Sequence, residues 1–163
     1  MFRIAAVTLS LLASTALPVL AESWTYTGGD GNPVTLEDAP LRIIASQDAA
    51  AGLIPLGIRP VGIYADSAVS NAKALQGLDL SGIEILSETW GEVDIEKAAA
   101  LRPDLIIAEY WPLETTWSGG DDVVKALSPL APITGPEQGA SILTLIEDYE
   151  VLAEGLGADL SQP

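Results

Sequence analysis

The chain has 163 residues, of which 48% are hydrophobic, 23 are acidic and seven are basic, so its net charge is −16. This length fits one domain with an ordinary core, and the acidic balance argues against binding of nucleic acid or anionic lipid. The absence of histidine and cysteine removes the commonest zinc, haem and copper ligands, the usual catalytic triads and any disulfide bond. We therefore predict no catalytic residue, no metal site and no cofactor.

Residues 1–21 have the pattern of a secretory signal peptide. Arg3 supplies a positive charge, the segment 4–20 is mostly apolar, and 19–21 offers small residues at the cleavage positions. The apolar run is too short and too interrupted to predict a membrane span. No cysteine follows the cleavage site, so a lipoprotein anchor is excluded. We expect a soluble, non-lipidated protein of a Gram-negative periplasm, with no stable membrane insertion.

Cleavage would remove Arg3 and no acid, which leaves six basic against 23 acidic residues and a net charge of −17. Two interpretations of this charge stay open. The favoured interpretation is solubility of an exported or salt-adapted protein, and the alternative is docking to a basic surface on a permease.

A β-hairpin is predicted first, because 24–27 and 33–36 alternate in polarity around the glycine-rich segment 28–32. Strands are expected next at 42–45, 61–64, 83–86, 105–108 and 131–134, and helices at 49–56, 122–127 and 141–156. Strands that alternate with helices predict an α/β fold with a doubly wound, mostly parallel sheet and flanking helices.

The segment 94–108 is the most informative. Asp94 is a good N-cap, Glu96 places negative charge in the first helical turn, and apolar residues at 95, 98, 99 and 101 predict a helical face. Pro103 disfavours helical backbone at Arg102, so the helix should end there. The apolar run 105–108 is typical of a parallel strand buried on both faces.

Four segments in this order resemble a known family. They are Leu41 to Ala45, Leu53 to Gly62, Val93 to Ile107, and Leu130 to Ile133. Together they are similar to the N-terminal lobe of the periplasmic substrate-binding proteins that serve ABC importers of ferric siderophores, haem or cobalamin. The resemblance implies that 22–163 forms this lobe. It also implies a second lobe that is absent from the sequence, with the ligand held between the two.

Ligands of open α/β sheets bind beyond the carboxyl ends of the strands, so the loops after each predicted strand are the candidate site. The residues selected in this way for ligand binding are Gln47, Asp48, Tyr64, Asp66, Trp90, Tyr110 and Trp111. Aromatic residues on such loops can cover a large apolar ligand, and the resemblance implies contact with a siderophore or corrinoid. An isolated loop aromatic can also pack on its own domain, and both interpretations stay open.

The acids of these loops are Asp48, Asp66, Glu88, Glu92 and Glu109, and none of the loops contains arginine. Because arginine pairs with oxyanions, its absence favours a neutral or cationic ferric hydroxamate, or a corrinoid, over an anionic chelate. Direct iron ligation by carboxylates is a less favoured alternative.

The resemblance also assigns Glu96 to permease docking, through an arginine pocket on the membrane component. The alternative is an acid that only complements the helix dipole, worth about 0.3–1 kcal/mol.

Apart from carboxylates, the sequence offers no general base that titrates near neutral pH, which argues against an enzyme. We therefore predict the periplasmic solute-binding component of an ABC importer for iron-siderophore or related chelates. The alternative is a stand-alone interaction or sensor domain of the same fold.

Overall fold

A five-stranded parallel sheet forms the centre of the computed structural model, which describes residues 23–139 and 141–161. The strand order is β5-β4-β3-β6-β9, and each neighbouring pair is parallel. The strands are β3 (Ile43–Ser46), β4 (Gly62–Ala65), β5 (Glu84–Glu88), β6 (Leu105–Ile107) and β9 (Ile133–Thr134). Each begins and ends within two residues of its predicted position, and β5 runs on to Glu88.

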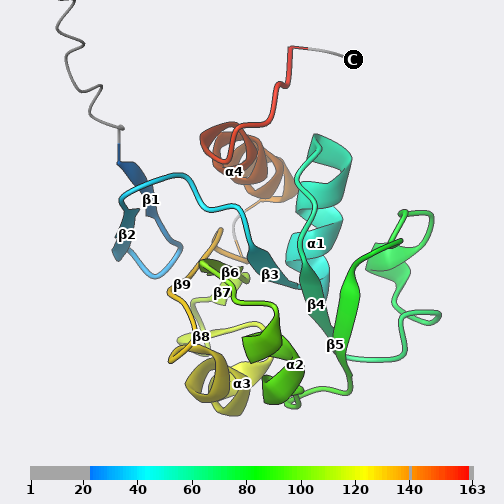
Figure 1. Ribbon diagram of the computed structural model, residues 1–163. Coiled ribbons are helices and arrows are strands. Elements are labelled where there is room, and N and C mark those ends of the chain that lie inside the picture. Colours follow the sequence, from blue (N-terminus) through cyan, green and yellow to red (C-terminus); the bar gives the residue numbers. More distant parts are fainter. Residues whose placement is uncertain (1–22, 140, 162–163) are drawn as a thin grey trace, which may run out of the picture.

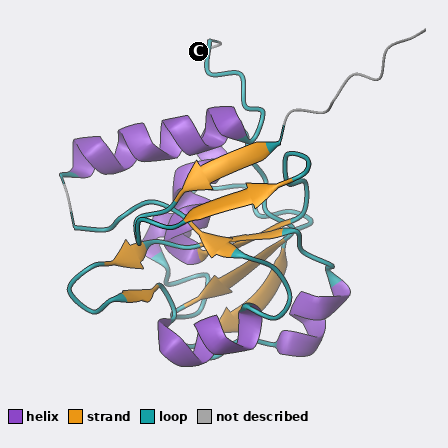
Figure 2. Cartoon of the chain, turned by 90° about the vertical axis from the view of Figure 1, so that its left-hand side faces the viewer, coloured by secondary structure: helices purple, strands orange, loops and turns teal. Residues whose placement is uncertain are grey.

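Helices cover both faces of the sheet, as Figures 1 and 2 show. Helices α1 (Gln47–Leu53) and α4 (Ile142–Gly155) lie on one face, and α2 (Ile95–Ala100) and α3 (Gly120–Leu127) lie on the other. Short 3₁₀ helices, η1 (Ile54–Leu56) and η2 (Lys73–Leu75), follow α1 and β4. The predicted α/β class with a doubly wound, mostly parallel sheet is confirmed.

Each face of the sheet has its own apolar core because side chains alternate along a strand. Ile43, Ile63 and Ile107 pack toward α1 and α4, whereas Ile44 and Ile106 pack toward α2 and α3. All five are almost fully buried, and burying one such side chain contributes about 1.5–3 kcal/mol. The continuous apolar runs of the sequence therefore follow from burial on both faces.

Two hairpins flank the sheet. The predicted one is confirmed as β1 (Trp24–Thr27) paired antiparallel with β2 (Pro33–Leu36), and it contacts α4. The second joins β7 (Tyr110–Trp111) to β8 (Thr116–Trp117), and its turn places Thr115 at a φ of 53°. The segment that begins at Glu109 was predicted to be a loop, and two-residue strands give too little alternation to be recognised from sequence.

Helices α1 and α3 each begin two residues before their predicted start. Ser46 was placed on a loop, but it ends β3 and caps α1, where its hydroxyl accepts the backbone N–H of Ala49 at 3.1 Å. The helix therefore begins at Gln47 rather than at residue 49. Asp94 is the N-cap of α2 as predicted, accepting the N–H of Lys97 at 3.0 Å, and Arg102 leaves the helix with a φ of 48°.

Helix α4 agrees with the predicted helix at 141–156. Ser141 is its N-cap, and Tyr149 and Leu152 turn their side chains into the core. None of the helices in the described ranges is long and apolar enough to cross a bilayer. The predicted signal peptide, residues 1–21, lies outside the described residues.

Candidate functional site

The parallel sheet brings most of the predicted ligand-binding residues to one edge. Gln47 and Asp48 form the first turn of α1, immediately after β3, and Asp66 follows β4. Trp90 follows β5, and Tyr110 and Trp111 follow β6. We call this the carboxyl edge, because all of these segments leave the carboxyl ends of strands.

Two segments of the carboxyl edge are joined through Gln47. Its amide oxygen accepts the backbone N–H of Asp66 at 3.2 Å, and its amide nitrogen lies 3.5 Å from the Asp66 carboxylate. Burial raises the pKa of Asp48 and of Asp66, and the negative charge of Asp48 raises the pKa of Asp66 further. These carboxylates therefore lie in partly desolvated surroundings, where a positive charge would be stabilised.

The tryptophans of the edge are exposed. Trp90 has 56% of its surface accessible and Trp111 has 36%, while Tyr110 is half-buried and packs edge-on against Trp117, with ring centroids 5.1 Å apart. Trp90 borders a hollow of about 560 Å³, and Trp111 borders another of about 330 Å³, and Glu114 lines both. Two rigid rings are thus available on either side of the β7–β8 turn.

Tyr64 is a correction. Sequence reasoning placed it at the mouth of the site, but only 3% of it is exposed. Its hydroxyl donates to the carbonyl of Ser118 at 3.0 Å, and burial raises its pKa. Its ring belongs to the core on the α2 and α3 face, so Tyr64 fixes the chain after β8 rather than facing a ligand.

Glu109 is the second correction. It was counted among the loop acids, but it is 1% exposed. Its carboxylate accepts the hydroxyls of Ser46 at 2.8 Å and Ser118 at 3.0 Å, and also that of Tyr149. Burial raises the pKa of Glu109, against the opposing effect of these hydrogen bonds. The one sequence signal was its position directly after the apolar run of β6.

A shallow hollow of about 260 Å³ leads toward Glu109 from the surface. Asp48 and Gln138 supply its polar wall, and apolar residues of α1 and α4 supply the remainder, namely Ala51, Gly52, Ile142, Leu145 and Ile146. Tyr149 also lines it. Gln138 lines both this hollow and the one beside Trp111.

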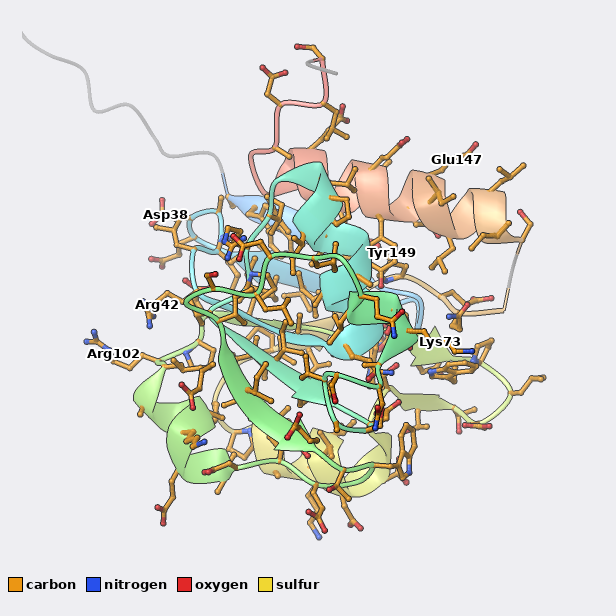
Figure 3. The ribbon with its side chains drawn as sticks, turned by 90° about the vertical axis from the view of Figure 1, so that its right-hand side faces the viewer. Asp38, Arg42, Lys73, Arg102, Glu147 and Tyr149 are labelled. Atoms are coloured by element: carbon orange, nitrogen blue, oxygen red, sulfur yellow. The ribbon has the colours of Figure 1, made fainter. Side chains whose placement is uncertain are left out.

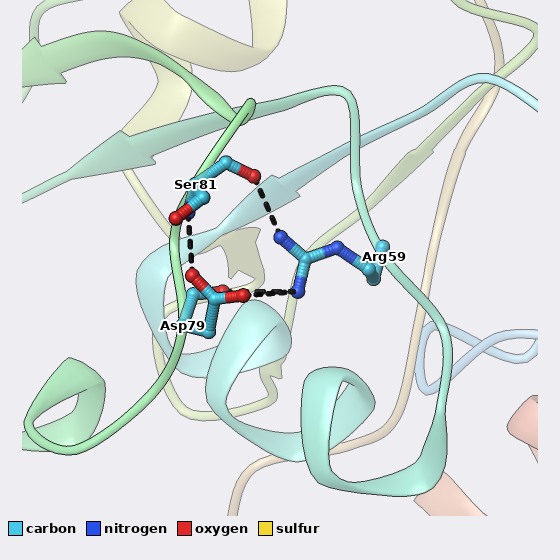
Figure 4. A network of polar contacts seen from close by, with 3 residues as sticks. All are labelled: Arg59, Asp79 and Ser81. Atoms are coloured by element: carbon cyan, nitrogen blue, oxygen red, sulfur yellow. Dashed lines mark hydrogen bonds and ion pairs between the residues drawn. The ribbon is translucent and has the colours of Figure 1, made fainter.

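The arginines of the described residues lie at the opposite edge of the sheet, where the strands begin. Arg59 precedes β4, where it contacts the carbonyls of Asp79 and Ser81 at 3.0 and 2.7 Å and the Asp79 carboxylate at 3.7 Å (Figure 4). Arg42 and Arg102 lie together on one side of the molecule, and Lys73 lies on the other (Figure 3). The carboxyl edge therefore presents acids and aromatic rings without arginine.

No group of three or more acidic side chains suited to hold a metal ion occurs among residues 23–139 and 141–161.

Glu96 is exposed in the first turn of α2. Its neighbour Lys97 pairs with Glu84 at 3.1 Å and reaches Asp94 at 4.0 Å. Within the described part of the chain Glu96 takes no part in a salt bridge. Its carboxylate is thus accessible to an external cation.

No family model and no curated protein matches the sequence. Solved structures do match. DesE, a ferric-siderophore receptor protein from Streptomyces coelicolor, is 26% identical with a TM-score of 0.75, over 85% of this chain and 48% of its own. The chain resembles the substrate-binding proteins of iron-siderophore importers. PiuA, an iron uptake ABC transporter substrate-binding protein from Streptococcus pneumoniae, matches with 23% identity and a TM-score of 0.60, over 84% of this chain and 45% of its own.

A third structure, Staphylococcus aureus SirA complexed with staphyloferrin B, gives 19% identity and a TM-score of 0.55, over 81% of this chain and 44% of its own. The chain therefore spans about half the length of the binding proteins that it matches. The resemblance inferred from the sequence is confirmed, and the matched fold is that of an iron-siderophore binding protein.

Proposed function

We propose that this chain is the N-terminal lobe, residues 22–163, of a solute-binding component that delivers ferric siderophores, or related iron or corrinoid chelates, to an ABC permease. The observation that carries the proposal is the match to DesE combined with the composition of the carboxyl edge. Two exposed tryptophans there flank the β7–β8 turn, and large apolar ligands are bound by such rigid rings. The proposal involves binding only and no covalent chemistry.

The charges of this edge favour one class of chelate. Asp48 and Asp66 are partly desolvated acids. Arg42 and Arg59 lie at the other edge of the sheet. An anionic tris-catecholate would therefore be repelled, whereas a cationic trihydroxamate would be attracted. We infer that a neutral or cationic ferric hydroxamate, or a corrinoid, is preferred.

Glu96 is proposed to dock the lobe on a basic pocket of the permease, because a carboxylate on a rigid first turn accepts the two N–H groups of an arginine. Charge reversal by Glu96→Arg should abolish chelate uptake by cells while leaving binding by the purified protein unchanged. Glu150→Arg, an exposed acid on α4, is the matched control and should retain uptake. Normal uptake with Glu96→Arg would remove Glu96 from the docking surface.

Residues 1–21 are proposed to be a cleaved signal peptide that directs the protein to the periplasm without lipid attachment. This follows from the charge, apolar length and small residues of the segment.

The ligand proposal is tested by tryptophan fluorescence of the purified protein against three chelates: ferric desferrioxamine B, ferric enterobactin and cyanocobalamin. We expect saturable quenching by the first or third, and weaker or no binding of the anionic second. Trp111→Ala should weaken the affinity about ten- to a hundredfold, as expected for losing about 1.5–3 kcal/mol of aromatic burial. Trp24→Phe, a buried residue of the β1–β2 hairpin, should leave it unchanged. A flat response to all three chelates would favour a stand-alone interaction or sensor domain.

A further inference from the structure

A chain of hydrogen bonds connects the exposed indole of Trp111 to the interior of the protein. The indole N–H donates to the hydroxyl of Ser118 at 3.1 Å, and that hydroxyl donates to the Glu109 carboxylate at 3.0 Å. Glu109 also accepts the hydroxyl of Ser46 at the start of α1 and that of Tyr149 on α4. One buried carboxylate thus joins β3, β6, β8 and α4.

The direction of these bonds depends on the charge of Glu109. A hydroxyl has one proton to donate, and an indole N–H can only donate. Because the Ser118 proton points to Glu109, its lone pairs are free to accept the indole of Trp111. An ionised carboxylate accepts all three hydroxyls, whereas protonation turns one of its acceptor sites into a donor and removes the charge that strengthens these bonds, so protonation of Glu109 weakens its hold on the three hydroxyls.

We propose that Glu109 is a positioning residue for the ligand wall, which holds the indole of Trp111 through Ser118 and couples its orientation to α4 through Tyr149. The proposal rests on the proposed function only in assigning Trp111 to a ligand wall. Position and burial support it. The Tyr149 ring passes directly over Gly52 of α1, where an added Cβ would lie 2.8 Å from ring carbons, and the backbone N–H of Ser118 donates to the Glu109 carbonyl at 2.9 Å.

The titratable groups around Glu109 come from three elements. They are Asp48 on α1, Tyr64 on β4 and Tyr149 on α4, and Asp66 acts in turn on Tyr64. Both tyrosines stay neutral because burial and the charge of Glu109 raise their pKa values. Asp48 raises the pKa of Glu109 by like-charge repulsion, so it serves as an independent lever on the protonation of Glu109.

The test is the indole ¹H–¹⁵N resonance of Trp111, assigned through Trp111→Phe and followed in the full chain by NMR. The titration runs upward from about pH 4, close to the ordinary glutamate pKa of about 4.3, because burial raises the pKa of Glu109. We expect the resonance to move in a single titration that is lost in Glu109→Gln and in Ser118→Ala. In Asp48→Asn the midpoint should fall, because the repulsive charge is gone. Ser87→Ala is the control and should titrate as the parent does, because the Ser87 hydroxyl hydrogen-bonds to Thr89 alone among the described residues.

A Trp111 resonance that does not respond to pH in the parent, or one that titrates identically in Glu109→Gln and Ser118→Ala, would overturn the proposal. If Glu109→Gln does not fold, as judged from the Trp24 resonance, Ser118→Ala and Asp48→Asn decide the matter. Binding of ferric desferrioxamine B without a Trp111 titration would reject the positioning role and keep the proposed function. The titration without binding of any chelate would do the reverse.

Discussion

The hydroxyl of Tyr149 offers the most specific test of the packing between α4 and the sheet. It donates to the Glu109 carboxylate, while its ring is 5% exposed and packs in the core. Tyr149→Phe removes this hydrogen bond but keeps the ring, so no cavity term is added.

The expected loss follows from the charge of the acceptor. A hydrogen bond to a charged group contributes about 1.5–3 kcal/mol, and removing the donor leaves a buried carboxylate less well satisfied. This range corresponds to about a ten- to a hundredfold change in the ratio of folded to unfolded protein. With a urea m-value of about 1–3 kcal/mol/M, the unfolding midpoint should fall by about 1 M.

The assay is urea unfolding at neutral pH followed by far-UV circular dichroism. Tyr26→Phe is the matched control, because Tyr26 is a half-buried tyrosine of the same core whose hydroxyl has no partner among the described residues. Its midpoint should stay close to that of the parent. Equal midpoints for Tyr149→Phe and Tyr26→Phe would refute the view that Glu109 is ionised and held by α4.

Two further predictions concern Glu109 and the N-terminus. Burial raises the pKa of Glu109 in the folded state, so the folded protein binds this proton more tightly than the unfolded chain does. The free energy of unfolding of the parent, relative to that of Glu109→Gln, should therefore fall as pH rises. The fall should begin near the ordinary glutamate pKa and end above the raised one. A difference that grows with pH over that window would mean that the hydrogen bonds outweigh burial. The signal-peptide proposal predicts that protein recovered from the periplasm begins at Glu22 by intact mass, and retention of Met1 would contradict it.

Much of the fold could be predicted because single segments carry its signals. The apolar runs of β3 and β6 follow from burial on both faces, the Asp94 cap from the residue type, and the α4 face from the helical spacing of Tyr149 and Leu152. The clustering of Asp66, Trp90 and Trp111 at one edge could be predicted because the carboxyl ends of parallel strands share an edge.

The corrected residues depend on partners that are distant in sequence. Glu109 looks like a loop acid because its three hydroxyl donors come from Ser46, Ser118 and Tyr149, which lie 63, nine and 40 residues away. Tyr64 looks like a strand-end aromatic until Ser118, 54 residues on, supplies a buried carbonyl acceptor. The β7–β8 hairpin is too short for its alternation to be recognised. Local periodicity does not contain this information.

The most direct test of the central claim is the paramagnetic broadening of backbone amide resonances by ferric desferrioxamine B, with the diamagnetic gallium complex as the control. The ferric ion broadens only nearby signals, so the measurement locates the chelate even when its affinity is weak. We predict that the amides of Asp66, Trp90 and Trp111 broaden, while those of Asp79 and Ser81 at the opposite edge of the sheet remain sharp. Broadening centred on Asp79 and Ser81, or none at any concentration, would contradict the claim that the carboxyl edge is the wall of a ferric-siderophore site.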